Sequence, residues 1–204
     1  MPTVDVLLPP LASLALGYLL GSIPFGVILT RLAGGTDPRS VGSGNIGATN
    51  VLRTGNKALA AATLVLDALK ATTAVLIAER LFGPAPFNFG GIAAAGAMFG
   101  HLYPVWLRFR GGKGVATLLG ALLGLQPFAA LVFAAVWIGA LLLTRFSSVG
   151  GMLAAVSAPV VAAVTGRFAL VFLLLGLALL VIWRHRGNIE RLLAGTEPRV
   201  GARG

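Results

Sequence analysis

The sequence consists of long apolar runs, and nearly all of its charged residues lie at the ends of these runs. The first run, Val6 to Thr30, is about 25 residues without a charge and would be about 37 Å long as a helix. A bilayer's hydrocarbon core is about 30 Å thick, so this run can cross it. Because backbone polar groups inside lipid must bond internally, we predict an all-α polytopic membrane protein, with a single domain over residues 1–204.

Composition favours the same class. Hydrophobic residues make up 57% of the chain and charged residues 11%, and the mean hydropathy is +0.91; soluble proteins carry about a quarter charged residues. The net charge of +10 would favour nucleic-acid binding in a soluble protein. Here the basic residues lie beside apolar runs, so topology and anionic partners explain them and no nucleic-acid partner is expected. Residues 1–10 carry no basic segment and do not resemble a signal peptide.

The helix count depends on the run from Val115 to Thr144. As one helix it would be about 45 Å long, which is long for a single crossing. Gln126-Pro127 falls near its middle, where a turn fits. We therefore predict two short helices there and about seven transmembrane helices in all: Val6–Thr30, Lys57–Arg80, Gly91–Leu107, the two halves of Val115–Thr144, Met152–Val164 and Phe168–Trp183.

Basic residues set the predicted orientation. With seven crossings and the N-terminus outside, only Arg80, near an external turn at Leu81–Phe89, and Arg167 lie outside, and Lys70 lies within a span. All other basic residues and the C-terminus are then internal, as the positive-inside rule prefers. The predicted internal set is Arg31, Arg39, Arg53, Lys57, Arg108, Arg110, Lys113, Arg145, Arg184, Arg186, Arg191, Arg199 and Arg203.

Local signals predict how the helices begin and meet. Asn56 is a candidate N-cap for the second helix, and Pro24 is expected to kink the first. Gly-x-x-x-Gly spacing at Gly17 and Gly21, and again at Gly96 and Gly100, predicts close helix contacts.

Two charges lie inside the second predicted helix. Asp67 and Lys70 are three residues apart and share a face, where charges are costly and usually point into a bundle. They form either a structural ion pair or part of an active site, and the structural role is favoured. His101, near the end of the third helix, is likewise expected to be structural support rather than catalytic.

The first of three polar stretches runs from Val41 to Arg53. Its small residues allow N–H groups to converge on an anion, and its polar side chains and Arg53 add donors. The alternative is an ordinary polar connector. Its candidate site residues are Ser43, Gly44, Asn45, Thr49, Asn50 and Arg53.

The second stretch, residues 108–117, leads into a predicted helix. Consecutive glycines can curl their N–H groups round an oxyanion, and the helix N-terminus and Lys113 add positive charge. The G-x-x-x-x-G-K-[ST] spacing is missing, which disfavours a nucleotide hydrolase. A tight basic turn is the alternative. The candidates are Gly111, Gly112, Lys113, Gly114 and Thr117.

The third stretch extends from His185 to Glu197. On one helix His185, Asn188 and Arg191 would share a face, although Gly187 weakens that interpretation. Histidine can shuttle a proton and asparagine can orient a hydroxyl; a basic tail lying on anionic lipid is the alternative. By topology all three stretches lie on the cytoplasmic side, where they can form one site. A shorter loop, residues 145–148, opens to the same side.

With no cysteine, two histidines and six carboxylates, the chain has few metal ligands. No metal and no cofactor are expected. Ser43 shows no partnered base, so a covalent serine mechanism is poorly supported.

These stretches resemble the bacterial acyl-phosphate:glycerol-3-phosphate acyltransferases. The resemblance lies in Ser-Gly-Asn-Ile-Gly-Ala-Thr-Asn with Arg53, in Gly-Gly-Lys-Gly-Val-Ala-Thr, and in His-x-x-Asn-x-x-Arg-x-x-x-Gly-x-Glu, in order and spacing. Gly-Ser-Ile-Pro-Phe-Gly near the start is also similar. Four blocks over nearly the whole chain make the resemblance specific.

The resemblance implies an activity and a place in the cell. An acyl group passes from acyl phosphate to the 1-hydroxyl of sn-glycerol 3-phosphate, giving 1-acylglycerol 3-phosphate and phosphate, the first acylation of phospholipid synthesis. The enzyme is expected in the bacterial inner membrane, among lipids, with its active site facing the cytoplasm and another enzyme supplying acyl phosphate. Ser43, Arg53, Lys113, His185 and Asn188 are expected to be catalytic, and Glu197 is expected to maintain integrity.

Two rival classes remain at this point. A small anion transporter could line a pathway with the same cations. An acyl-CoA-dependent acyltransferase is disfavoured, because enzymes that use a His base with a neighbouring Asp carry His-x-x-x-x-Asp, and neither histidine has an Asp five residues later.

Overall fold

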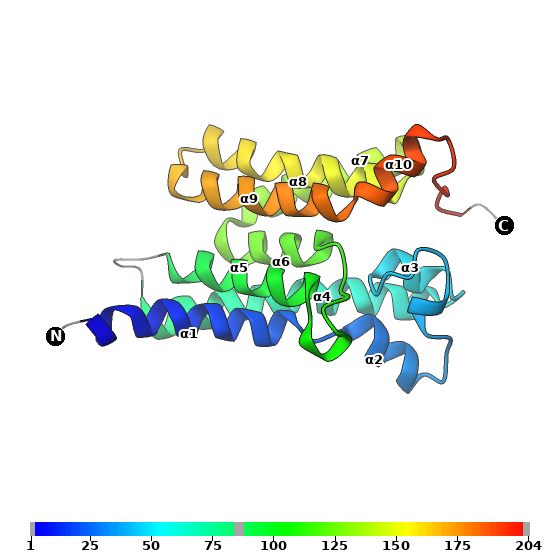
Figure 1. Ribbon diagram of the computed structural model, residues 1–204. Helices are drawn as coiled ribbons and strands as arrows, with labels where there is room; N and C mark the ends of the chain where they lie inside the picture. Colours follow the sequence, from blue (N-terminus) through cyan, green and yellow to red (C-terminus); the bar gives the residue numbers. More distant parts are fainter. Residues whose placement is uncertain (1–2, 84–87, 202–204) are drawn as a thin grey trace. The chain divides into compact units, whose positions relative to one another are not determined.

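The computed structural model describes residues 3–83 and 88–201, and these are helical with connecting loops and no strand. The chain divides into two compact units, residues 1–125 and 126–204 (Figure 1). The helices of the first unit are α1 (Thr3–Gly21), α2 (Phe25–Leu32), η1 (Pro38–Ser40), α3 (Ala48–Leu52), α4 (Lys57–Phe82), α5 (Phe89–Leu102), η2 (Val105–Leu107) and α6 (Val115–Leu125). Those of the second unit are α7 (Pro127–Thr144), α8 (Ser147–Val164), α9 (Phe168–Arg184) and α10 (Arg186–Leu193).

Glycines bring α1 and α5 into close contact. A Cβ on Gly17 or Gly21 would overlap backbone carbonyls of α5, and one on Gly96 or Gly100 would overlap those of α1. The two Gly-x-x-x-Gly faces therefore pack against each other, as predicted, because only glycine lets two helix backbones approach so closely.

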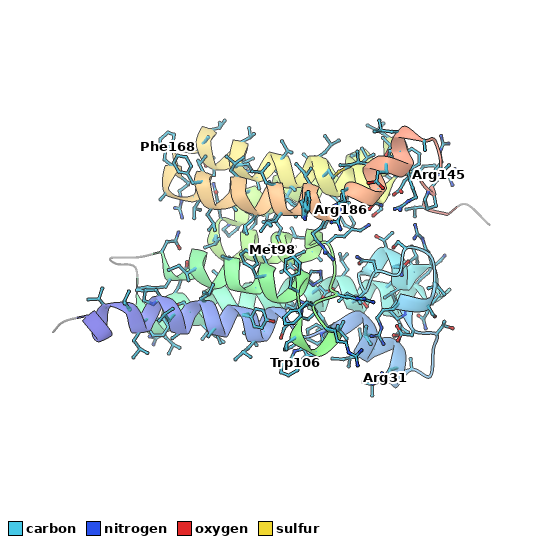
Figure 2. The ribbon with its side chains drawn as sticks, in the orientation of Figure 1. Arg31, Met98, Trp106, Arg145, Phe168 and Arg186 are labelled. Carbon is cyan, nitrogen blue, oxygen red and sulfur yellow. The ribbon has the colours of Figure 1, made fainter. Side chains whose placement is uncertain are left out.

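The first predicted helix is broken rather than kinked at Pro24. α1 ends at Gly21 and α2 begins at Phe25, since proline lacks the N–H that a continuous helix needs. The indole of Trp106 (labelled in Figure 2) donates to the Ser22 hydroxyl at 2.8 Å, so the segment after α5 is fastened to this break.

α4 begins where the sequence predicted. The side chain of Asn56 accepts a hydrogen bond from the Leu59 N–H at 3.0 Å, which confirms the N-cap. Along its length α4 packs against α6, where the Thr72 hydroxyl donates to the Gly120 carbonyl at 2.8 Å. The predicted external turn at Leu81–Phe89 lies partly outside the described residues, because residues 84–87 are not among them.

Two predicted boundaries were wrong. The third helix ends at Leu102 instead of Leu107, because Pro104 stops α5 and a 3-10 turn follows. α8 starts at Ser147 instead of Met152, because residues 147–151 form its first turn rather than a loop. The predicted break at Gln126-Pro127 is confirmed: α6 ends at Leu125 and α7 starts at Pro127.

The second unit packs α7 against α8 and α8 against α9. Gly150 of α8 lies on Trp137 of α7 with no room for a Cβ, which draws these two helices together. α9 and α10 meet at an angle of 55° around His185.

Apolar helices make this a membrane protein. Four helical segments within residues 3–83 and 88–201 are long and apolar enough to span a bilayer: Val6–Leu32, Lys57–Phe82, Pro127–Thr144 and Ser147–Val164. The bent pair α9–α10 makes a fifth if it counts as one span. Large apolar side chains such as Leu143 (88% exposed) and Phe172 (83% exposed) face outward, as lipid contact requires. The all-α membrane fold is confirmed, whereas seven crossings, the orientation and the single domain stay predictions; Arg203 lies outside the described residues.

Candidate active site

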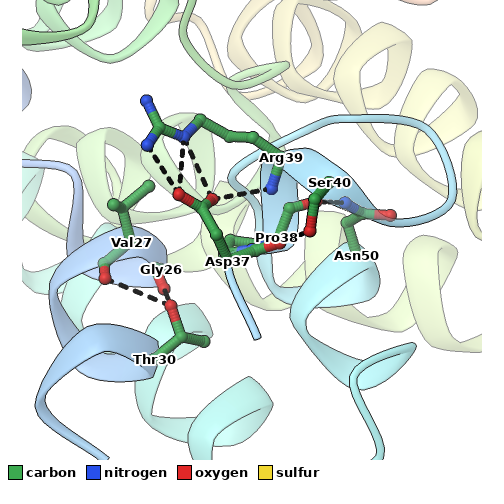
Figure 3. A network of polar contacts seen from close by, with 8 residues as sticks. All are labelled: Gly26, Val27, Thr30, Asp37, Pro38, Arg39, Ser40 and Asn50. Atoms are coloured by element: carbon green, nitrogen blue, oxygen red, sulfur yellow. Dashed lines mark hydrogen bonds and ion pairs between the residues drawn. The ribbon is translucent and has the colours of Figure 1, made fainter. Parts of the chain in front are cut away.

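Asn50, buried with 3% of its surface exposed, organises the first polar stretch. Its amide nitrogen donates to the carbonyls of Pro38 (Figure 3), Val41 at 3.1 Å and Asn45 at 2.8 Å. These bonds close the loop on itself. The structure therefore places Asn50 inside the loop as its support, and the substrate contact predicted for it remains a prediction.

Ser43 and Arg53 are held by the same oxygen atom. Asn50 Oδ1 accepts from the Ser43 N–H at 3.2 Å, the Ser43 hydroxyl at 3.4 Å and Arg53 Nη1 at 3.3 Å. Both side chains are exposed, so a neutral amide arranges a hydroxyl and a guanidinium at the protein surface. An amide oxygen is no general base, so this contact does not activate Ser43 as a nucleophile.

The remaining residues of this stretch shape the backbone. Asn45 Oδ1 accepts from the Gly47 N–H at 2.9 Å, just before α3 begins. Gly42 has φ +53°, and a Cβ there would crowd Asn50 and Arg53. The last two candidates of this stretch differ in exposure: Gly44 is exposed and Thr49 half-buried.

A surface ion pair lies beside this stretch. Asp37 and Arg39 pair at 2.6 Å, and Figure 3 shows the several bonds between them. The hydrogen bond from Arg39 holds the pKa of the Asp37 carboxyl below its usual range.

The second polar stretch is tied to the end of α5. The Gly111 N–H donates to the Leu102 carbonyl at 3.1 Å, and the Gly112 N–H to the His101 carbonyl at 3.0 Å. These two N–H groups therefore bond backbone carbonyls of α5, and not the oxyanion that the consecutive glycines predicted. The N–H groups of Gly111 and Gly112 are thus already bonded within the protein. A role of these two glycines in binding substrate stays a prediction.

The end of this stretch is better placed for an anion. Lys113 is half-buried and lies two residues before the start of α6, and the first N–H groups of a helix have no partner within it. The hydroxyl of Thr117, in the first turn, is buried and makes no hydrogen bond to any described residue. Gly114 has φ +87°, and a Cβ there would overlap the sulfur of Met98 (labelled in Figure 2).

A buried charge cluster in the first unit connects α4 and α5 to the break between α1 and α2. Lys70 Nζ lies 2.7 Å from Asp67 Oδ1, 2.9 Å from the Ile23 carbonyl oxygen and 3.0 Å from His101 Nδ1. The predicted Asp67–Lys70 ion pair is thus present, and His101 is its neighbour. Because an ammonium only donates, Nδ1 of His101 accepts, and the neutral ring carries its proton on Nε2.

The third polar stretch encloses a carboxylate. Glu197 accepts from Asn188 Nδ2 at 2.6 Å, the Ser148 hydroxyl at 2.7 Å and Arg191 Nε at 2.8 Å. Burial raises the pKa of the Glu197 carboxyl, but the three donors outweigh burial and bring the pKa below its ordinary value. Glu197 is thus the centre of this stretch, in keeping with the structural role predicted for it.

His185 lies just before the helix that carries Asn188 and Arg191. It lies at the junction between α9 and α10, because its own N–H still bonds back into α9 while its carbonyl starts α10. Its Nδ1 lies 2.7 Å from the Val181 carbonyl and must donate to it, so the neutral ring keeps a lone pair on Nε2.

Sequence reasoning found most of these residues but not their partners. Ser148 appeared only as part of a short loop, and the Ile23 carbonyl and the link between His101 and Lys70 were not foreseen. No local pattern marks contacts between residues so far apart in the chain. Within residues 3–83 and 88–201, no three His, Cys, Asp or Glu side chains group as metal ligands.

The fold and these stretches define a helical membrane protein with donor-rich loops at the ends of apolar helices. Known proteins give the class more closely. The family model of glycerol-3-phosphate acyltransferase matches residues 11–195. Glycerol-3-phosphate acyltransferases of Allorhizobium ampelinum (52% identical, covering 100% of both chains) and Brucella ovis (57% identical, covering 95% of this chain and 94% of the relative) are similar to it.

Solved structures agree. Two crystal structures of PlsY (YgiH), an integral membrane glycerol 3-phosphate acyltransferase, are similar to the chain. The glycerol 3-phosphate form has a TM-score of 0.88 at 40% identity and covers 94% of this chain and 96% of its own. The lysophosphatidic acid form has a TM-score of 0.86 at 39% identity and covers 94% and 95%. The chain belongs to the glycerol-3-phosphate acyltransferase family and is therefore a membrane enzyme of lipid biosynthesis.

Proposed function

We propose that this enzyme transfers a long-chain acyl group from acyl phosphate to the 1-hydroxyl of sn-glycerol 3-phosphate. The products are 1-acylglycerol 3-phosphate, which is lysophosphatidic acid, and inorganic phosphate. The reaction is the first acylation step of phospholipid biosynthesis. Its acceptor and product are supported by the two similar crystal structures, which are of a glycerol 3-phosphate form and a lysophosphatidic acid form.

The observation that carries the proposal is the joint placement of Ser43 and Arg53 on one amide oxygen of Asn50. A fixed guanidinium binds phosphate in a fork geometry, and a nearby hydroxyl donates to an oxyanion. An acyl phosphate is already activated, so the enzyme needs to position two substrates rather than form a covalent intermediate.

In the proposed reaction the glycerol hydroxyl attacks the acyl carbon directly, and the bond to the phosphate oxygen breaks. Ser43, Asn45 or loop N–H groups stabilise the tetrahedral oxyanion. Arg53 and Lys113 hold the two phosphates and offset their repulsion, and the α6 N-terminus with Thr117 adds donors. Gly44, Thr49 and Gly114 complete the proposed substrate loops.

The proton of the attacking hydroxyl has two proposed acceptors. One is the leaving phosphate, whose second pKa is about 6 to 7 on the phosphoester precedent. The other is His185, whose ring is oriented by the Val181 carbonyl so that Nε2 is its basic nitrogen. Asn188, whose amide bonds Glu197, acts beside it. A His185→Ala variant that keeps kcat and only weakens glycerol 3-phosphate binding would favour the phosphate.

We place the enzyme in the bacterial inner membrane with its active site facing the cytoplasm, where an acyl-phosphate-forming enzyme delivers the donor. The distribution of Arg and Lys supports this orientation. That the three polar stretches share one site stays a prediction. Because the chain has no cysteine, single cysteines at Ser43, Lys113 and His185 can report which side of the membrane each occupies.

The decisive assay compares acyl donors. Purified enzyme is given radiolabelled glycerol 3-phosphate with palmitoyl phosphate, palmitoyl-CoA or palmitoyl acyl-carrier protein. We expect labelled lysophosphatidic acid and stoichiometric phosphate with palmitoyl phosphate alone, unchanged in excess chelator. An Arg53→Lys variant is the matched control for the proposed role of Arg53 in binding phosphate. It keeps the positive charge and loses the forked guanidinium that binds a phosphate through two N–H groups. Turnover with palmitoyl-CoA and none with palmitoyl phosphate would overturn the proposed donor.

A further inference from the structure

Asp67 and Lys70 are charged side chains that the proposed reaction does not use. Their side chains are 3% and 2% exposed within α4, one of the apolar spans. Burying two charges costs several kcal/mol each before pairing returns part of it. An apolar pair would stabilise the packing of the helices at least as well. The charges therefore contribute directional contacts, which fix the positions of the groups that they bond.

The ammonium of Lys70 has three N–H donors, and three acceptor atoms surround it. Asp67 is on the same helix, whereas the Ile23 carbonyl belongs to the break between α1 and α2 and His101 to the end of α5. The ring of Phe25 lies 5.9 Å away, in cation–π range. Lys70 thus fixes two points outside its own helix, one in the break between α1 and α2 and the other near the end of α5.

The first point supports the Val41–Arg53 stretch. Three residues after Ile23, Gly26 lies on the carbonyl of Ile46 so closely that a Cβ would overlap it. Ile46 is buried in the middle of the stretch, between Ser43 and Asn50. A displacement of the α1–α2 break therefore presses on the loop that carries Ser43 and Arg53.

The second point supports the Gly-rich stretch. Lys70 sets the His101 ring so that Nε2–H faces Gly112, where a Cβ would overlap that nitrogen. The Gly112 N–H also bonds the His101 carbonyl at 3.0 Å. The imidazole thus fixes the backbone directly before Lys113.

We infer that Asp67, Lys70 and His101 form a buried clamp that positions both polar stretches of the first unit, and through them Ser43, Arg53 and Lys113. They are positioning residues, because the clamp acts through backbone and makes no substrate contact. This rests on the proposed roles of the two stretches, but not on which acyl donor the enzyme uses.

The test uses the contact between His101 and Gly112. Gly112→Ala forces the methyl group against the imidazole and is expected to lower kcat/KM for glycerol 3-phosphate about 10- to 100-fold, the scale of a misplacement of about 1 Å. His101→Asn keeps an acceptor near Nδ1 for Lys70 and empties the space at Nε2. The Gly112→Ala/His101→Asn double variant is therefore expected to recover to the level of His101→Asn alone.

Gly111→Ala is the matched control. Its methyl group would overlap the backbone carbonyl of His101, which His101→Asn leaves in place. No recovery is expected in Gly111→Ala/His101→Asn. The clamp is overturned if His101→Asn restores kcat/KM equally in the Gly111→Ala and Gly112→Ala backgrounds, or if it restores nothing in Gly112→Ala. A Gly112→Ala enzyme with normal kinetics also overturns it.

Two further measurements keep the result decisive. If Gly112→Ala does not fold, a folded His101→Asn enzyme with normal kcat/KM and a melting temperature near that of the parent overturns the clamp by itself. Equilibrium binding of radiolabelled glycerol 3-phosphate to each variant measures loop placement without any acyl donor. A parent enzyme that binds glycerol 3-phosphate but does not use palmitoyl phosphate would refute the proposed donor and leave the clamp test intact.

Discussion

In the part of the chain that the structure describes, a buried ion pair lies in each of the two units, and the group at its centre is a cation in one unit and an anion in the other. In the first unit a cation, Lys70, is surrounded by acceptors; in the second an anion, Glu197, is surrounded by donors. The first cluster lies within apolar helices, whereas Arg191 of the second is 39% exposed. The lysine therefore depends wholly on protein partners, whereas the cluster around the glutamate reaches the protein surface through Arg191.

The two histidines show the same contrast. Lys70 donates to Nδ1 of His101, which puts the proton on Nε2, whereas Nδ1 of His185 donates to the Val181 carbonyl, which leaves Nε2 basic. In the neutral rings, Nε2 of His101 is therefore a donor and Nε2 of His185 an acceptor, and the proton transfer to His185 stays a proposal. The comparison shows that the partner of Nδ1 selects the tautomer of a buried neutral histidine.

The largest effect is expected at Lys70. Lys70→Met leaves Asp67 as a buried, uncompensated charge, so we expect a loss of about 3–5 kcal/mol in the free energy of unfolding. Thermal unfolding in detergent measures it. Asp67→Asn/Lys70→Met is the control, since it removes both charges and is expected to regain most of that loss. A Lys70→Met protein as stable as the parent would contradict the claim that the buried charges of the first unit depend on one another.

An intermediate effect is expected at Glu197, with a defined pH dependence. Glu197→Gln weakens three hydrogen bonds to a charged group, which amounts to about 1.5–3 kcal/mol at neutral pH. Because the folded-state pKa lies below the ordinary value of about 4.5, this stability is present above pH 4.5 and is lost as pH falls through the folded pKa.

Melting temperatures of the parent and Glu197→Gln proteins should therefore differ at pH 7 and converge below pH 4.5. Ser148→Ala serves as control, because it removes one donor and leaves the carboxylate ionised. A difference that stays constant with pH would show that Glu197 stabilises the unit by packing and not by charge.

The smallest effect is expected at Asp37, whose pKa is lowered like that of Glu197 but at the surface. Its pair with Arg39 is exposed to water and salt, so Asp37→Asn is expected to cost less than about 1 kcal/mol. A loss as large as that at Glu197 would mean that burial is not what separates the two carboxylates.

Features that depend on neighbouring residues could be predicted from the sequence. The Asn56 cap, the break at Gln126-Pro127 and the Gly-x-x-x-Gly contacts all follow from local backbone chemistry. The errors lay at helix boundaries, where Pro104 stopped α5 early and Ser147 opened α8 early. A hydropathy pattern cannot locate a helix end when polar and small residues suit both a loop and a first turn.

The sequence by itself determined that this is a helical membrane protein, because long uncharged runs have no other stable environment. It also determined which residue types could bind phosphate. Only the tertiary structure decided what those residues touch: Asn50 supports its own loop, the Gly111 and Gly112 N–H groups bond α5, and Lys70 joins Ile23 to His101. Polar groups inside a membrane protein must find partners wherever the fold brings them, and residues 31 or 47 positions apart in the chain meet only when the helices pack.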